Sequence, residues 1–277
     1  MVSTPSFELK LVVLPSDEFP KFPRLYTDST FELPYKDLYN LIIHTEFSSS
    51  KDEIRYNLNG VCLHSEGAGR ICAASTDVFR LSTFFVESPD ATKSFKIILP
   101  TKTVDFIRNL SNSALENHII KAKINNNIIE LAILNTLIVS KLIDGSFPDY
   151  QGLIPKANNS KLIVNKNIFA NAIDRVSGIT DEKSKAIKIS INKEIIEIFA
   201  YTQSKGEAKQ SIKSFFSYDG EPISVAFQPR YLLDVMNLAK GQDDLDVEFL
   251  FKDSSSPIVI TCSKLENALF VVMPIKI

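Results

Sequence analysis

The sequence predicts an α+β protein made of repeated domains, each with two helices packed on antiparallel sheets. A strand, a polar or proline break and an amphipathic helix follow one another four times, in residues 31–50, 94–110, 161–180 and 223–240. Alternating apolar and polar residues, typical of antiparallel strands, follow these units. The units recur about every 65 residues, and a fixed period indicates a repeated architectural unit.

Two proline-containing segments divide the chain. Pro20 and Pro23 interrupt regular strand pairing after a strand expected at Phe7–Leu14. The segment FPDYQGLIP, residues 147–155, separates two longer regions of similar pattern. We therefore expect three parts, which are residues 1–22, 23–155 and 156–277.

Each of the two longer regions is expected to contain two helices on one face of the sheets and about eight strands, in the order βαβββ twice. In the first region, Leu38, Leu41, Ile42 and Phe47 have the spacing of a helix over 35–47. A hairpin turn is expected at residues 65–69, and a further strand, helix and meander at 95–153. In the second region, we expect a strand and a helix at 161–177, strands at 186–200 and 207–216, a strand and a helix at 223–239, and strands at 245–251, 257–263 and 268–273.

The composition limits the classes of function. The chain has 277 residues, of which 44% are hydrophobic and 23% charged, as in globular domains with cores. Because the formal net charge is −2, any contact with DNA must come from a local basic patch. Three cysteines without a CxxC motif favour neither a disulfide framework nor a zinc site. The sequence shows no signal peptide and no apolar run of about 18 residues, so we expect a cytoplasmic protein.

No pattern in the sequence predicts catalysis. No metal-ligand spacing relates the three histidines, His44, His64 and His118. Nucleophile-elbow, Walker A and GxGxxG motifs are absent. Asp181 and Glu182 are expected in a solvated loop, and Asp149 in a turn. We therefore expect no catalytic residue, no cofactor and no metal.

Four stretches carry a resemblance to a known family. They are LNGVCL at 58–63, ASTDVFRLS at 74–82, LIDGSFPDYQGLIP at 142–155 and VVMPIKI at 271–277. Two less specific segments, KSKAIKISI at 183–191 and QPRYLLDVMNL at 228–238, also align. In these stretches the chain resembles the bacterial β sliding clamp, the processivity subunit of DNA polymerase III. The order and spacing hold from about Phe7 to the last residue, and the resemblance implies the DNA-clamp fold.

Members of that family have three similar domains per chain, and two chains close a ring of six domains. This chain resembles the second and third domains, the middle and the C-terminal domain. Phe7–Leu14 resembles the last strand of a first domain, followed by a linker. Whether the chain is part of a longer one or the product of a shortened gene stays open. Its oligomeric state also stays open among monomer, dimer and trimer.

The resemblance implies a cleft between the two domains that binds short, partly apolar peptides. Apolar walls would supply burial energy, while Arg80 and the Thr76 hydroxyl would fix the peptide by hydrogen bonds. The family usually has Gly-His where this chain has Val78-Phe79, a basic residue near Gly152 and a larger side chain at Ser184, and these differences should alter peptide preference. Periodicity alone would instead place the apolar residues in a strand core and make Arg80 a surface cation. The implied cleft residues are Leu58, Thr76, Val78, Phe79, Arg80, Leu81, Pro148, Leu153, Tyr231, Val271, Val272, Met273, Pro274 and Ile275.

The resemblance further implies that the helices face DNA. Cations on that face would attract phosphates without reading bases, as sliding requires. Each of them taken singly can also be an ordinary solvated residue. The residues on or beside the helices are Lys36, Lys102, Arg108, Arg175, Arg230 and Lys240, and those on the loop 51–57 are Arg55 and Tyr56.

Together these features predict a non-catalytic DNA sliding clamp. Such a protein encircles duplex DNA and tethers the DNA polymerase III α subunit, the clamp loader and repair polymerases through short peptides. One alternative is a truncated clamp that acts only as a peptide-binding hub without encircling DNA. Another is a nucleic-acid-processing enzyme with metal-dependent nuclease activity.

Overall fold

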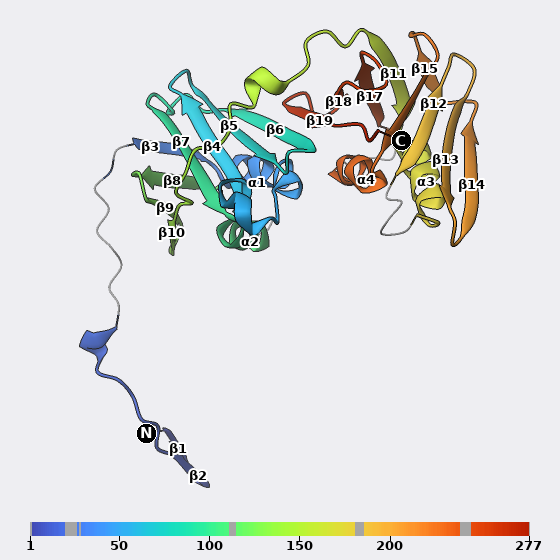
Figure 1. Cartoon of the computed structure of the whole chain (residues 1–277). Coiled ribbons are helices and arrows are strands. Elements are labelled where there is room, and N and C mark those ends of the chain that lie inside the picture. Colours follow the sequence, from blue (N-terminus) through green and yellow to red (C-terminus); the bar gives the residue numbers. More distant parts are fainter. Residues whose placement is uncertain are drawn as a thin grey trace.

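The computed structural model describes residues 2–19, 27, 29–110, 115–180, 186–238 and 245–276. They form two α+β units and an N-terminal arm that extends away from both units (Figure 1). We call residues 29–150 the middle unit and residues 160–276 the C-terminal unit. No helix in the described part of the chain is long and apolar enough to cross a membrane.

The N-terminal arm contains a small hairpin in place of the long strand expected at Phe7–Leu14. Strand β1 (Val2–Thr4) pairs with β2 (Phe7–Leu9), and the short 3-10 helix η1 (Ser16–Glu18) follows. Residues 10–15 form no regular element, and their apolar side chains are exposed. A strand needs a hydrogen-bonded neighbour, and within the described residues none lies beside this part of the arm.

The middle unit follows the expected order. Its elements are β3 (Ser29–Pro34), α1 (Tyr35–Ile43), β4 (Gly60–Glu66), β5 (Arg70–Thr76), β6 (Arg80–Glu87), β7 (Ser94–Pro100), α2 (Thr101–Asn109), β8 (Ile119–Ile124), β9 (Ile128–Ile133) and β10 (Thr136–Lys141). Pro34 and Pro100 directly precede the two helices, where a fixed φ is compatible with helix entry and a missing N–H costs little. The helix expected over 35–47 ends at Ile43, and Phe47 lies in the short 3-10 helix η2 (Glu46–Ser48). A second 3-10 segment, η3 (Glu53–Leu58), precedes β4.

The C-terminal unit repeats this order. Its elements are β11 (Ser160–Asn165), α3 (Lys166–Ser177), β12 (Ile187–Ile191), β13 (Ile196–Thr202), β14 (Gly206–Ile212), β15 (Phe216–Tyr218), β16 (Ile223–Phe227), α4 (Pro229–Leu238), β17 (Asp246–Phe251), β18 (Ile258–Cys262) and β19 (Ala268–Val272). The Asn165 side chain caps α3 by accepting the N–H groups of Asn167 and Ile168 at 3.1 and 3.2 Å. Such a cap satisfies donors that have no partner within the helix.

The internal repeat expected from the sequence is confirmed. The strands that precede the four helices begin at residues 29, 94, 160 and 223, so the period is about 65 residues. In the described residues, the order βαβββ occurs twice in each unit, and β15 is the one additional strand of the C-terminal unit.

Three sheets and the small hairpin of the arm contain all the described strands. Two sheets of four strands, β10-β9-β8-β3 and β14-β13-β12-β16, lie at the outer ends, and a long sheet runs between them in the order β15-β11-β17-β18-β19-β6-β5-β4-β7. The long sheet is continuous because β19 of the C-terminal unit pairs antiparallel with β6 of the middle unit. Figure 1 shows the four helices along one side of this long sheet, as the sequence predicts.

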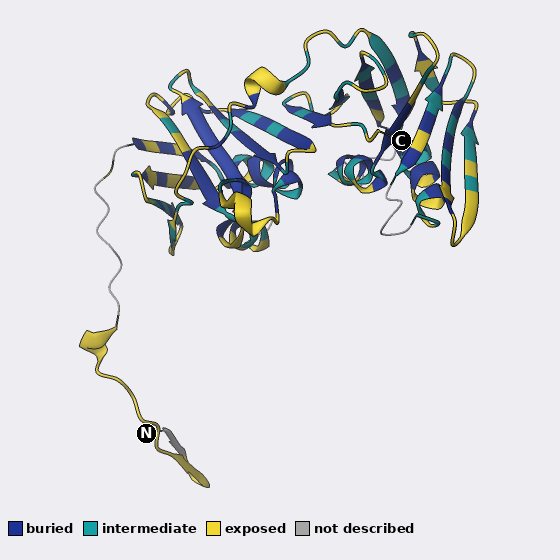
Figure 2. Ribbon diagram, viewed as in Figure 1, coloured by how far each residue is buried: buried dark blue, intermediate teal, exposed yellow. Residues whose placement is uncertain are grey.

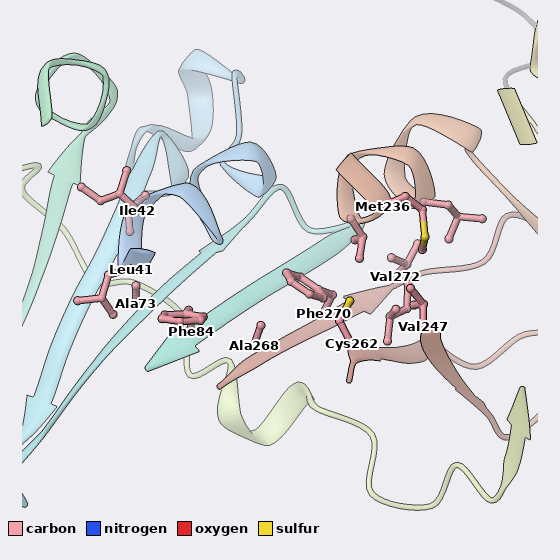
Figure 3. Packing of buried hydrophobic residues seen from close by; sticks show 14 of the residues in the cluster. Leu41, Ile42, Ala73, Phe84, Met236, Val247, Cys262, Ala268, Phe270 and Val272 are labelled. Atoms are coloured by element: carbon pink, nitrogen blue, oxygen red, sulfur yellow. The ribbon is translucent and has the colours of Figure 1, made fainter. Parts of the chain in front are cut away.

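The hydrophobic core also continues across the β6–β19 joint. Phe84 on β6 lies near Ala268 and Phe270 on β19, and the row of buried side chains extends to Met236 on α4 (Figure 3). The helices are buried on the side that faces the sheets and exposed on the other side (Figure 2). Because side chains of both units share one core, the joint is a packed interface and not a flexible link.

Candidate peptide cleft and DNA-facing surface

The turn between β5 and β6 presents two large apolar side chains to solvent. Val78 and Phe79 are 52% and 57% exposed. Val78 has a φ of 82°, a left-handed conformation that is strained for a β-branched residue. The Thr76 hydroxyl oxygen accepts the N–H of Val78 at 3.1 Å, and an Asp77 carboxylate oxygen accepts the N–H groups of Phe79 and Arg80, each at 3.0 Å. These bonds fix the turn in its strained shape.

The C-terminal segment lies directly beside this turn. The Met273 N–H donates to the Phe79 carbonyl at 2.8 Å, and the Ile275 N–H donates to the Ala226 carbonyl of β16 at 2.8 Å. The segment therefore runs from the turn of the middle unit to a strand of the C-terminal unit. The side chains of Met273 and Ile275 remain exposed, while Pro274 between them is half-buried.

The connection between the two units is the third segment of the candidate peptide cleft. Residues 143–154 cover the face of the long sheet that lies opposite the helices, where Phe147 and Tyr150 pack with Leu58, Leu81 and Val271 in a small second cluster. The short 3-10 helix η5 (Gln151–Leu153) ends this connection, and Leu153 is 66% exposed while Pro148 is half-buried.

Two polar contacts fasten the connection to the sheet. His64 Nε2 is hydrogen-bonded to the Tyr150 hydroxyl at 2.6 Å, and Lys96 Nζ donates to the Phe147 carbonyl at 3.0 Å. Burial lowers the pKa of His64 and raises the pKa of Tyr150. Both groups are therefore neutral near pH 7, which suits their contact in a buried site.

The structure places ten of the fourteen implied cleft residues in three groups. Val78, Phe79, Leu153, Met273 and Ile275 are exposed, and we call this set the apolar rim. Leu58, Leu81 and Val271 are buried in the cluster beneath the connection, and Val272 is buried in β19, where its backbone is paired with Arg80. Tyr231 is half-buried on α4, on the helix side of the sheet, so it faces away from the connection.

The expected role of Arg80 and Thr76 in fixing a peptide by hydrogen bonds stays a prediction, and both side chains already form hydrogen bonds within the chain. Arg80 is 7% exposed, and its guanidinium donates to Asp77 at 3.0 Å, to Asp234 at 2.6 Å and to the Phe47 carbonyl at 2.5 Å. The same group lies 4.6 Å from the ring centre of Tyr231. The Thr76 hydroxyl donates to the Arg80 carbonyl at 2.6 Å. Both side chains are used inside the protein, and Arg80 joins the two units because Asp234 and Tyr231 belong to α4.

A cavity of about 540 Å³ opens between the units on the helix side. Arg80, Arg108, Arg230 and Lys51 line it together with four carboxylates, those of Glu46, Asp77, Asp105 and Asp234. The cavity is therefore balanced in charge and not basic as a whole.

The residues expected to face DNA differ in whether they form ion pairs with carboxylates of the same chain. Lys36, Lys102 and Arg175 are exposed on α1, α2 and α3, and they form no ion pair within the described residues. Arg108, by contrast, is paired with Glu46 at 2.7 Å and with Asp105 at 2.6 Å. The sequence did not indicate this neutralisation, because Glu46 lies 62 residues away along the chain.

Two of the remaining residues expected to contact DNA form ion pairs with longer distances between nitrogen and oxygen. Arg230 lies 3.6 Å from Asp234, and Arg55 lies 3.8 Å from Asp52. Tyr56 is exposed on η3, and so is Ile54, which the sequence analysis did not single out. Lys240, and with it Asp181, Glu182 and Ser184, lies outside the described residues.

Comparison with known proteins places both units in one family. The family model for the DNA polymerase III beta subunit, central domain, matches residues 32–149, and the model for its C-terminal domain matches residues 151–276. The beta sliding clamp of Rickettsia felis is 38% identical over 279 residues, which cover 98% of this chain and 73% of that protein. The beta sliding clamp of Rickettsia bellii is 37% identical over 96% of this chain and 72% of that protein.

The chain belongs to the family of beta sliding clamps, the beta subunits of DNA polymerase III. It is accordingly a DNA sliding clamp, a non-catalytic processivity subunit. Solved structures agree with the fold. The sliding clamp of Bartonella birtlesii bound to griselimycin has a TM-score of 0.88 at 29% identity, over 95% of this clamp and 70% of that chain. The C. crescentus clamp, with polyethylene glycol bound at a proposed beta-motif tethering region, has a TM-score of 0.87 at 30% identity, over 95% of this clamp and 69% of that chain.

The strained turn is the feature of this clamp that its sequence indicated least. Glycine, the residue that the family resemblance leads one to expect at position 78, adopts a φ of 82° without strain because it has no Cβ. This clamp instead has valine there and phenylalanine after it. The exchange adds apolar surface at the joint of the two units at a cost in backbone strain.

Proposed function

We propose that this clamp encircles duplex DNA in the cytoplasm and tethers its partners through short, partly apolar peptides that bind the apolar rim. The partners of this kind are the DNA polymerase III α subunit, the clamp loader and repair polymerases. We assign the residues 23–155 to a middle clamp domain and 156–277 to a C-terminal clamp domain. Residues 1–22 would then be the last strand of a first domain and the linker that follows it.

The observation that carries the peptide proposal is the strained, exposed turn at Val78 and Phe79. Neither side chain contributes to the core, and strain of this kind persists at sites where function requires it. Leu153, Met273 and Ile275 come from two other segments of the chain and add further exposed apolar surface. An apolar peptide side chain that covers such surface gains roughly 25 cal/mol for each Å² removed from water. Methionine adapts its shape to different ligands, which suits a site with several partners.

The free cations on the helix side support the DNA proposal. Among the described residues Lys36, Lys102 and Arg175 have no ion-pair partner, so they can contact phosphates without first leaving one. Contacts to phosphates carry no sequence information, so they permit sliding. A polymerase held by its peptide on such a ring has a raised effective concentration at the primer end.

The peptide proposal is tested with a fluorescent clamp-binding peptide from a DNA polymerase III α subunit. We expect saturable binding by the native chain, and at least a tenfold loss of affinity when Phe79→Ala and Met273→Ala are combined, because each substitution removes roughly 1–2 kcal/mol of apolar contact. The control is Val12→Ala with Leu14→Ala, which removes exposed apolar side chains from the N-terminal arm. Equal affinities of the rim variant and the native chain would disprove the assignment of the cleft.

A further inference from the structure

Asp77 uses both oxygens of its carboxylate inside the turn between β5 and β6. Its Oδ1 atom accepts the N–H groups of Phe79 and Arg80, each at 3.0 Å, and its Oδ2 atom accepts the Nε–H of Arg80 at 3.0 Å. The side chain is 17% exposed. A carboxylate that already accepts three hydrogen bonds has little capacity left for a donor from outside. Asp77 therefore belongs to the framework of the turn.

The cap formed by Asp77 differs from similar caps elsewhere in the chain. At four other places a side-chain oxygen accepts the N–H groups two and three residues further along, and these caps are formed by Asn125, Asn165, Asn192 and Asp253. Among the described residues that directly follow such a cap, only Val78 has a positive φ. Strain of this kind persists only where the surrounding bonds determine the backbone. At Val78 those bonds come from Asp77 and from the Thr76 hydroxyl, which accepts the N–H of Val78.

The shape of this turn also sets where the C-terminal segment attaches. The Phe79 carbonyl accepts the Met273 N–H at 2.8 Å. Because peptide groups are planar, the direction of this carbonyl depends on the dihedral angles of the turn, and a changed φ at Val78 would turn it away from Met273. The cap therefore holds together two parts of the apolar rim that lie far apart in the sequence.

The second oxygen of Asp77 offers a different explanation for the residue. It pairs with Arg80, whose guanidinium also donates to Asp234 of α4 at 2.6 Å and to the Phe47 carbonyl. Asp77 could thus serve as a counter-ion of Arg80 and not as a cap. Arg80 keeps two acceptors without Asp77, however, whereas the left-handed turn depends on Asp77 for two of its N–H groups.

We propose that Asp77 is a positioning residue of the peptide site, a role that rests on the peptide binding at the apolar rim proposed above. It acts as the cap that holds Val78 in its left-handed conformation, so that the side chains of Val78 and Phe79 face solvent before a peptide arrives. Asp77 itself does not touch the peptide. A site that is ordered in advance binds more tightly, because less conformational freedom is lost on binding.

The test compares two substitutions of Asp77 that each change one property. Asp77→Asn removes the charge but keeps a carbonyl oxygen in place, and Asp77→Glu keeps the charge but moves the oxygens by one methylene group. With the fluorescent clamp-binding peptide, we expect Asp77→Asn to bind within about twofold of the native chain, since asparagine caps as well as aspartate. We expect Asp77→Glu to bind about tenfold more weakly, because the strained turn loses its cap. The reverse order would overturn the proposal and assign Asp77 to the charge of Arg80.

A double-mutant cycle with Val78 gives a readout that general destabilisation would not move. Glycine adopts a φ of 82° without a cap. In the presence of Val78→Gly, Asp77→Glu should therefore weaken peptide binding by less than about twofold, against about tenfold in the native turn. An equal loss in both backgrounds would overturn the proposal. If Asp77→Glu does not fold, as judged by urea unfolding, Asp77→Asn decides alone, because a tenfold loss in that variant contradicts the role of a cap.

The matched control is Asn192→Gln, which lengthens a cap of the same kind by one methylene group in the turn between β12 and β13. No strained residue follows this cap, and we expect native peptide affinity. A loss equal to that of Asp77→Glu would overturn the proposal, because any loosened turn would then have the same effect. The rim variant, Phe79→Ala with Met273→Ala, separates the two proposals. If it binds like the native chain, the proposed function fails, and if it alone loses affinity while Asp77→Glu does not, only the role of Asp77 fails.

Discussion

At the scale of single residues, this clamp is distinguished by two side chains of the β5–β6 turn. Val78 is strained and exposed, whereas Arg80, two residues later, is buried and bonded to three acceptors. The sequence analysis placed both in the peptide cleft. For Val78 that role stays a prediction. For Arg80 it also stays a prediction, and its guanidinium forms a polar contact that holds α4 of the C-terminal unit to β6 of the middle unit.

Replacing Val78 separates strain from apolar contact. In Val78→Gly the strain at a φ of 82° is relieved, and in Val78→Ala it remains because alanine keeps the Cβ. We expect the glycine variant to be more stable than the alanine variant by about 1 kcal/mol in urea unfolding. Both variants should bind the peptide more weakly than the native chain, since both lose the same methyl groups. A glycine variant less stable than the alanine variant would show that the turn is not strained.

Removing the Arg80 side chain should destabilise the clamp strongly. In Arg80→Met, Asp234 and the Phe47 carbonyl lose a charged donor in a buried place, which costs about 3 kcal/mol. Adding Asp234→Asn should restore part of this loss, because the carboxylate no longer lacks a partner. The control is Arg70→Met, whose half-exposed pair with Glu87 contributes less than about 1 kcal/mol. Equal losses for the two arginines, measured by urea unfolding, would refute the buried network.

At the scale of elements, the helices and hairpins lie close to where the sequence predicts them, whereas the strand predicted in the N-terminal arm is shorter than expected. Pro34, Pro100 and the Asn165 cap set helix starts by local chemistry, so periodicity and turn residues were sufficient there. The strand expected at Phe7–Leu14 shortened to Phe7–Leu9, because a strand depends on a neighbour that its own sequence does not supply. The contact of Tyr150 with His64 likewise could not be predicted from the local sequence, because 86 residues separate the two side chains along the chain.

The packing of residues 143–154 on the sheet should make stability depend on pH. Burial lowers the pKa of His64 in the folded state below its ordinary value of 6.5. Below pH 6.5 the unfolded chain therefore binds a proton that the folded chain excludes, so stability decreases as the pH falls from 6.5 towards the folded-state pKa. We expect His64→Gln, which can still bond to Tyr150, to reduce this loss in urea unfolding at several pH values.

A second histidine serves as a reference for that experiment. His44 is also buried, and burial lowers its pKa too, so the His64→Gln variant should retain a part of the pH dependence. Identical pH profiles for the His64→Gln variant and the native chain would exclude this histidine as the titrating group.

At the scale of the whole molecule, one strand pair turns two units into a continuous arch. The β6–β19 joint aligns the four helices along one side of the long sheet, and it brings the turn of Val78 beside the C-terminal segment (Figure 1). Ion pairing then decides which cations of that side remain free, and Arg108 is not among them.

The difference between free and paired cations predicts how DNA binding responds to salt. Lys102→Gln should weaken binding to duplex DNA and reduce the slope of log K against log salt concentration by about 0.9, the value for one phosphate contact. Arg108→Gln should reduce the slope less, because Glu46 and Asp105 already occupy its guanidinium. The measurement is a fluorescence titration with duplex DNA at several salt concentrations. A larger effect of Arg108→Gln would mean that its ion pairs open when DNA binds.

The sequence by itself determined the α+β class, the fourfold repeat of strand and helix, and the clamp family. These properties depend on periodicity, proline positions and short motifs, which act between residues close in the chain. Only the tertiary structure decided that β19 pairs with β6 and that Arg80 is held by Asp234. Such contacts join residues far apart in sequence, and their partners are set by how whole sheets pack, which no local pattern encodes.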